Sequence, residues 1–163
     1  MSVSGKRIIE RRKRDLLDAQ YLSAERDDTM SKADELRATL RRLPEIYGSG
    51  DFEGYIEHYA PDLTSYFEGV VSNYDEACSF IRSMFEGGGK TLEFHTGDRT
   101  QVMFNASEDA ATLCYPWHEK FRFADGRVTD TDYYQSEVWF RRDGRWKIVH
   151  VHLTVASESE TKG

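Results

Sequence analysis

Apolar residues recur at helical spacing through the first half of the chain. Between residues 31 and 48 they follow one another at steps of three and four, which places them on one face of a helix. The residues of this face are Ala33, Leu36, Leu40, Leu43 and Tyr47. Ser31 is expected to cap this helix, Asp51 a second short helix and Asn73 a third, because such side chains accept hydrogen bonds from first-turn amides.

After residue 90 the pattern changes to long runs with the alternation of strands. The predicted strands cover residues 91–104, 109–123, 127–142 and 146–156. Each run exceeds the ~5–6 residues of an ordinary strand, so we expect bends or bulges. Helices followed by an antiparallel meander are typical of an α+β fold. We predict a curved antiparallel sheet that wraps around three N-terminal helices and leaves a pocket at the wide end of a cone.

Charge is distributed unevenly along the 163 residues. The chain has 22 Lys and Arg against 29 Asp and Glu, a formal net charge of −7, which disfavours nucleic acid as a partner. Residues 1–28 are nevertheless basic at their start, and we interpret them as an arm, helical or flexible, that is solvated or contacts an acidic neighbouring subunit. The domain itself is placed at 29–157, followed by a disordered tail at 158–163.

The sequence also bears on compartment and metal binding. No apolar run approaches the ~20 residues of a membrane span, and the basic start is not followed by the apolar stretch of a secretory signal. Cys78 and Cys114 form neither a CxxC motif nor a metal-ligand spacing. We therefore expect a soluble cytoplasmic protein of one domain that interacts with neither membrane nor nucleic acid.

Alternation along the strands assigns side chains to the two faces of the sheet. The inward set of the 109–123 strand is aromatic or apolar apart from Glu119: Leu113, Tyr115, Trp117, Glu119, Phe121 and Phe123. On the last strand we expect the face with His150 and His152 to point inward, because Lys147 lies on the other one. That other face carries apolar residues expected to bury in a homodimer or larger homo-oligomer: Val149, Val151 and Leu153.

Three segments resemble the NTF2-like superfamily. Residues 50–55 (GDFEGY) and 59–64 (YAPDLT) resemble a signature of that superfamily. Residues 138–152 (VWFRRDGRWKIVHVH) closely resemble the last hairpin of the association domain of calcium/calmodulin-dependent protein kinase II and of SnoaL-like proteins generally. The resemblance covers roughly residues 33–156 and implies an NTF2-like cone. It leaves the function open, because this fold hosts enzymes, binding proteins and oligomerisation modules.

Departures from the relatives change the expected pocket chemistry. The kinase association domain carries arginines deep in its pocket, and this chain has Glu137 at one such position, directly before the Val-Trp pair. The strand that would supply another arginine offers His118 and Glu119. The base of ketosteroid isomerases would fall at Phe67, so that constellation is not copied. The resemblance therefore implies an acidic pocket that bears histidine.

Four residues are predicted to carry acid–base chemistry: His152, His150, Glu119 and Glu137. An imidazole beside a carboxyl can move protons near pH 7, and burial would raise the pKa of the acids into a usable range. His152 is given the larger role because it lies farther along the strand from the turn. The residues predicted to bind substrate are Tyr55, Tyr59, His95, Tyr115, Trp117, Phe121, Tyr133 and Trp139.

These residues favour a cofactor-independent SnoaL-like enzyme. It would act as a lyase, dehydratase or isomerase on a small aromatic or polycyclic compound. The alternative is a non-catalytic oligomerisation or ligand-binding module like the kinase association domain, in which the histidines only bond neighbouring strands. No cofactor and no metal are expected, since the His-x-His pair, even with Glu137 or His95, lacks a clear third ligand.

Overall fold

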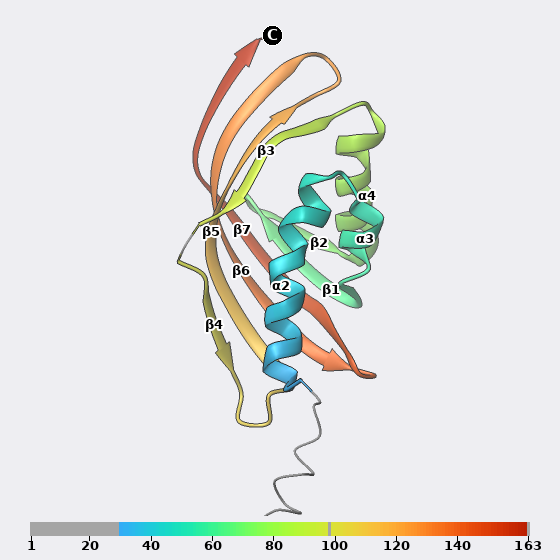
Figure 1. Ribbon diagram of the computed structural model, residues 1–163. Coiled ribbons are helices and arrows are strands. Elements are labelled where there is room, and N and C mark those ends of the chain that lie inside the picture. The colour runs from blue at the N-terminus through green and yellow to red at the C-terminus, as the bar shows by residue number, and fades with distance from the viewer. Residues whose placement is uncertain (1–29, 98, 163) are drawn as a thin grey trace, which may run out of the picture. The chain divides into compact units, whose positions relative to one another are not determined.

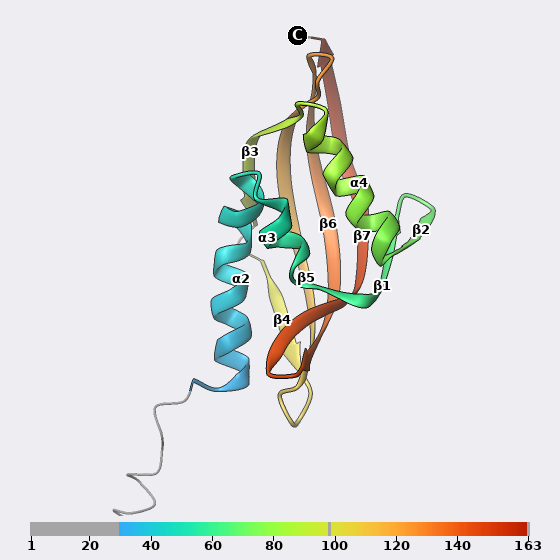
Figure 2. The ribbon, with the colours of Figure 1, turned by 90° about the vertical axis from the view of Figure 1, so that its right-hand side faces the viewer.

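The computed structural model describes residues 30–97 and 99–162, and the predicted basic arm at 1–28 lies outside them. From Lys32 onward the chain forms one compact unit of the α+β class. Its described part has three helices and a seven-stranded sheet (Figure 1). The helices all lie on one face of a curved, open sheet (Figures 1 and 2). The predicted α+β fold, a curved sheet with three helices on one face, is confirmed.

The three helices begin where capping side chains were predicted. They are α2 (Lys32–Gly48), α3 (Phe52–Ile56) and α4 (Tyr74–Glu86). The Asp51 carboxylate accepts a hydrogen bond from the Gly54 amide at 3.0 Å. At α4, Asn73 Oδ1 accepts from the Glu76 amide at 3.1 Å, and Glu76 Oε2 accepts from the Asn73 amide at 3.0 Å. This reciprocal pair is a capping box, which satisfies two otherwise free donors at once.

The sheet is antiparallel except at one pair of strands. Its strands are β1 (Tyr59–Phe67), β2 (Val70–Asn73), β3 (Lys90–Thr96), β4 (Gln101–Phe104), β5 (Ala110–Arg122), β6 (Arg127–Arg142) and β7 (Arg145–Lys162). Their order is β2-β1-β7-β6-β5-β3, with β4 also paired to β5, and β1 and β7 run parallel. The single strand predicted at 91–104 is thus two strands, separated by a break after Thr96.

The last strand is longer than the sequence pattern suggested. β7 continues to Lys162 and pairs with β6 as far as Arg127, so residues 158–162 are strand in place of the expected disordered tail. This end of β6 and β7 extends beyond the helices (Figure 1). Residues 158–161 are polar and exposed, so they lack the alternation of apolar and polar positions by which a strand is recognised in a sequence. The strand forms nevertheless, because main-chain hydrogen bonds do not depend on the polarity of the side chains.

A bulge in β7 decides which side chains face the helices. Trp139 of β6 pairs with Ile148, whereas the preceding Val138 pairs with His150, so Val149 is an extra residue in β7. Such a bulge reverses the alternation of the strand beyond it. Ile148 is fully buried under the helices before the bulge, and from Val151 to Val155 the odd-numbered residues take the inner face.

The prediction for the outer face of β7 is therefore wrong. Val151 is only 6% exposed, and both Val151 and Leu153 line an internal cavity. They cannot form the outer apolar surface expected for assembly. His150 and His152 take the outer face instead, beside Thr64 of β1.

Side chains from β6 and β7 hold α2 at the edge of the sheet. The Arg141 guanidinium donates to both carboxylate oxygens of Glu35, at 2.9 and 3.2 Å. The Trp146 indole donates to the Lys32 carbonyl oxygen at 2.9 Å. These contacts fix the first turn of the helix against the strands, so the distance between α2 and the sheet is set by named bonds as well as by apolar packing.

Candidate functional site

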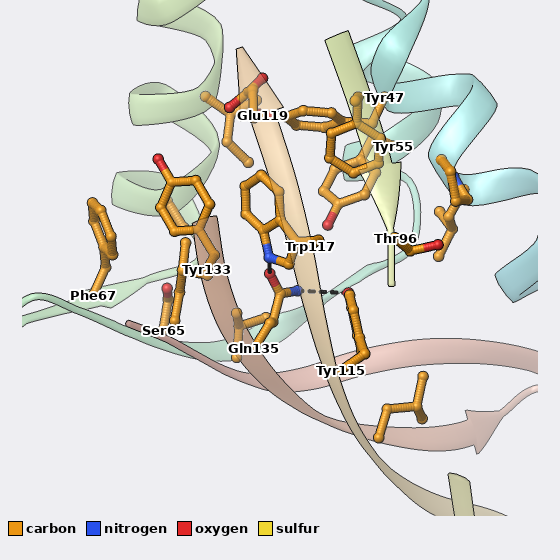
Figure 3. Close-up of a pocket in the computed structure, with 18 of the residues that line it drawn as sticks. Tyr47, Tyr55, Ser65, Phe67, Thr96, Tyr115, Trp117, Glu119, Tyr133 and Gln135 are labelled. Atoms are coloured by element: carbon orange, nitrogen blue, oxygen red, sulfur yellow. Dashed lines mark hydrogen bonds between the residues drawn. The ribbon is translucent and has the colours of Figure 1, made fainter. Parts of the chain in front are cut away.

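A cavity of about 990 Å³ lies between the helices and the sheet (Figure 3). Six aromatic residues labelled in the close-up contribute to its lining: Tyr47, Tyr55, Phe67, Tyr115, Trp117 and Tyr133. Ligand pockets are commonly concave, mostly apolar and about 300–1,000 Å³, so this cavity has room for a molecule of several rings.

The aromatic wall is held together by ring contacts. Trp117 and Tyr133 are directly opposite in the pairing of β5 with β6, and their rings stack at 4.1 Å with an angle of 18° between planes. Phe94 of β3 packs 5.3 Å from Trp117, and Tyr47 of α2 lies 4.9 Å from Phe94. Residues from three strands and a helix therefore present one preformed surface on which a flat ligand can pack.

The Gln135 side chain forms hydrogen bonds with two aromatic residues of the cavity lining, Trp117 and Tyr115. Its Oε1 accepts a hydrogen bond from the Trp117 indole at 2.9 Å, and its Nε2 donates to the Tyr115 hydroxyl at 2.9 Å (Figure 3). These two bonds fix which way the amide points. The Trp117 ring is consequently oriented both by stacking and by a buried hydrogen bond.

Glu119 is a carboxyl group placed in the aromatic lining. Its side chain is 3% exposed, and the Thr91 hydroxyl donates to it at 3.0 Å. Burial raises the pKa of Glu119 from its ordinary value to about 7, while hydrogen bonds from Thr91 and Tyr47 act in the opposite direction. A group with that pKa exchanges protons readily near neutral pH.

Glu137 is buried behind the cavity lining. It is 1% exposed and accepts hydrogen bonds from the Tyr115 hydroxyl at 2.9 Å, from Gln135 Nε2 at 2.5 Å and from the Trp139 indole at 2.6 Å. Burial raises the pKa of Glu137, and these three donors oppose the rise. The residue is not among those that line the cavity, so its contacts give it a role in positioning Tyr115 and Gln135.

The two histidines predicted to be catalytic lie away from this cavity. His150 Nδ1 is 2.7 Å from the Thr64 hydroxyl oxygen, and the exposed His152 packs edge-on against Tyr66 at 4.9 Å. Both are on the outer face of the sheet, whereas Glu119 points to the inner face. The predicted histidine–glutamate pairing is corrected accordingly, and the cause is the bulge at Val149.

The predicted substrate-binding residues divide into two groups. Those that line the cavity are Tyr55, Tyr59, Tyr115, Trp117 and Tyr133. Phe121 packs instead between Phe85 and Phe123 in the core. Trp139 is fully buried and bonds to Glu137. His95 is exposed and stacks on His118 at 4.7 Å, so these three are corrected to structural or surface positions.

Sequence reasoning missed several residues of the site. Tyr47 is the last residue on the apolar face of the first predicted helix, and its spacing alone does not indicate that it lines a cavity. Gln135 lies between Tyr133 and Glu137 on the same face of one strand, and this spacing could have placed it in the site. Thr91 carried no signal, because its contact with Glu119 is set by the register of β3 on β5, in which Thr91 lies opposite Phe121.

Residues 30–97 and 99–162 contain neither a metal-binding cluster nor a membrane-spanning helix. Within them, no three His, Cys, Asp or Glu side chains are grouped in a way that could hold a metal ion. The same residues include no helix with the length and apolar character needed to cross a bilayer.

Solved structures with the same fold define the class of protein. An NTF2-like protein of Rhodospirillum rubrum is 21% identical and covers 76% of this chain and 100% of its own, with a TM-score of 0.64. A ketosteroid isomerase-like protein of Erwinia carotovora atroseptica is 17% identical and covers 76% of this chain and 95% of its own, with a TM-score of 0.63. The described part of the chain from Lys32 onward thus has the NTF2-like fold.

Within that class, the chain belongs to the calcium/calmodulin dependent protein kinase II association domain family, whose model matches residues 32–157. The rabbit (Oryctolagus cuniculus) calcium/calmodulin-dependent protein kinase type II subunit delta is 27% identical over 137 residues, which are 83% of this chain and 26% of the kinase subunit. The chain thus spans about a quarter of that relative. A candidate association domain of Exiguobacterium sibiricum has a TM-score of 0.67 at 11% identity and covers 81% of this chain and 98% of its own.

Proposed function

We propose that the protein is an acid–base enzyme that binds a small aromatic or polycyclic compound in the cavity and transfers a proton through Glu119. One observation carries the proposal: a carboxyl group with a pKa of about 7 lines an aromatic cavity of about 990 Å³. A general acid or base works best when its pKa is near the working pH. The stacked pair Trp117 and Tyr133 supplies a surface for a flat substrate.

The chemistry best suited to this site is proton abstraction next to a carbonyl group. The ionised Glu119 would take the proton from carbon, and the electron pair of the broken C–H bond would move onto the carbonyl oxygen. Tyr55 and Tyr59 line the cavity, and burial raises the pKa of both, so their hydroxyls stay protonated and able to donate to that oxygen. Return of the proton to another atom gives isomerisation, and loss of a leaving group gives a lyase or dehydratase reaction.

Self-association is a second candidate function, supported by the outer face of the sheet. Tyr134 and Phe140 of β6 are 64% and 38% exposed, large apolar surfaces for side chains in the middle of a sheet. Pro116 of β5 and Thr154 of β7 lie beside Tyr134 in the register, so this part of the outer face carries little charge. The family is named after an association domain, which is consistent with an interface between copies here.

Substitutions at two adjacent tyrosines test ligand binding and self-association independently. Tyr133 faces the cavity and Tyr134 faces outward, so replacing each with alanine removes a ring from a single face. We expect Tyr133→Ala to weaken binding of 2-tetralone, a bicyclic ketone, at least about 2- to 13-fold in a fluorescence titration, since an aromatic contact contributes about 0.5–1.5 kcal/mol beyond the area that it buries. Tyr134→Ala should leave that affinity unchanged and shift any oligomer toward monomer in sedimentation.

The contrary outcomes are equally distinct. If 2-tetralone does not bind, or binds equally well to both variants, the cavity is not the aromatic site that we propose. If the wild-type protein sediments as a monomer at micromolar concentration, the outer face is not an interface between copies.

A further inference from the structure

Exposed residues line the cavity at two places, which we call the α2 opening and the α4 opening. Arg37 and Arg41 of α2 line one end, and both side chains are exposed. Val70 of β2 and Phe80 of α4 line the other end, where they are 62% and 54% exposed. α2 and α4 lie over opposite edges of the same face of the sheet, α2 near β3 and α4 near β1 (Figure 2). An elongated ligand can therefore lie across the sheet with its two ends near different openings.

The two openings differ in charge. At the α2 opening, Arg37 forms an ion pair with Asp34 at 3.0 Å and lies over the Phe104 ring at 5.2 Å. Arg41 is one helical turn farther along, on the same side of α2. Over residues 30–97 and 99–162, no acidic side chain forms an ion pair with Arg41.

Among the described residues that line the cavity, the two cations are Arg37 and Arg41, and neither lies at the α4 opening. Val70 and Phe80 make it apolar, and the acidic residue in its lining is Glu68. One oxygen of the Glu68 carboxylate already accepts a hydrogen bond from the Val155 amide at 2.8 Å. A ligand with an anionic end would therefore be repelled from the α4 opening and attracted to the α2 opening.

We propose that the natural ligand is an apolar organic acid, whose flat body packs on Trp117 and Tyr133 and whose carboxylate binds Arg41 at the α2 opening. The guanidinium fork matches a carboxylate in shape and charge, so one arginine can fix the ligand's orientation. This inference rests on the proposed function, because it assigns a substrate class to the same cavity. The orientation would leave the rings of the ligand within the aromatic lining that contains Glu119.

A matched pair of probes tests the proposal: 4-(2-naphthyl)butanoic acid and its methyl ester. They share a ring body and chain length and differ in charge at neutral pH. We expect the wild-type protein to bind the acid about 3- to 10-fold more tightly than the ester in calorimetric titrations at low salt, the range for a partly exposed charge-assisted contact. Arg41→Gln should remove this preference and leave the affinity for the ester unchanged.

Arg42→Gln is the control variant. Arg42 is the next residue on α2 and is also exposed, but it does not line the cavity, so its replacement should preserve the preference for the acid. Equal binding of acid and ester by the wild-type protein would overturn the proposal, as would equal effects of the Arg41 and Arg42 substitutions. Both results would leave aromatic binding intact, whereas failure of both probes to bind would contradict the proposed function itself.

Discussion

Replacing Glu119 with glutamine should slow the exchange of the α-protons of 2-tetralone about 10²- to 10⁴-fold, the usual contribution of a general acid or base. The amide retains the size of the side chain and an oxygen that can accept from the Thr91 hydroxyl, but it cannot take up a proton from carbon. The exchange is measured by NMR in D₂O at neutral pH, with the rate in buffer alone subtracted.

The pH dependence gives this result a second readout. A base must be ionised to act, so the wild-type rate should rise as pH increases through about 7, the pKa of Glu119, and level off above it. Glu93→Gln is the matched control, because Glu93 lies on β3 with a side chain that is 59% exposed. A Glu119→Gln protein that exchanges 2-tetralone at the wild-type rate would exclude Glu119 as the base.

Replacing Glu137 with alanine should lower the free energy of unfolding by about 3–5 kcal/mol, because it leaves several buried donors without an acceptor. The donors are the Tyr115 hydroxyl, the Gln135 amide and the Trp139 indole, all within 2.9 Å of the carboxylate. Urea denaturation followed by tryptophan fluorescence measures the change. Glu137→Gln should cost less, since its amide oxygen keeps one acceptor at the same place.

The exposed Glu93 provides the control for this loss of stability. Glu93→Ala removes only a 3.8 Å ion pair between the exposed Glu93 and the partly exposed Lys120, so its cost should stay below about 1 kcal/mol. If Glu137→Ala is as stable as Glu93→Ala, the three hydrogen bonds do not hold the back of the cavity together as we infer.

The fold was predictable because local signals and the global pattern agree. Asp51 and Asn73 start helices in the structure, as their capping side chains indicated. Pairing of β5 with β6 is continuous, without a register shift, so alternation placed Glu119 and Trp117 correctly on the inner face. Where a strand is uninterrupted and one face is covered, period-two reasoning identifies the inward side chains.

The histidine prediction failed for a reason that the sequence does not display. One extra residue, Val149, reverses the faces of β7 at the two histidines, and nothing in a run of alternating valines and histidines marks where this bulge falls. Tyr47 was missed for another reason: a helical apolar stripe does not distinguish a core contact from a cavity wall. Cavities depend on how far a helix stands from the sheet, which here reflects distant contacts such as Arg141 with Glu35.

The most direct test of the proposed site is the titration of the Glu119 carboxyl itself. The protein is labelled with ¹³C at the glutamate side-chain carboxyl carbons, and the Glu119 resonance is assigned as the one absent from the Glu119→Gln variant. We expect its chemical shift to titrate with a midpoint near pH 7, since burial raises the pKa to about 7. A midpoint near 4.5, the ordinary value for a glutamate, would show that the carboxyl is solvated and would contradict its assignment as the proton-transferring group.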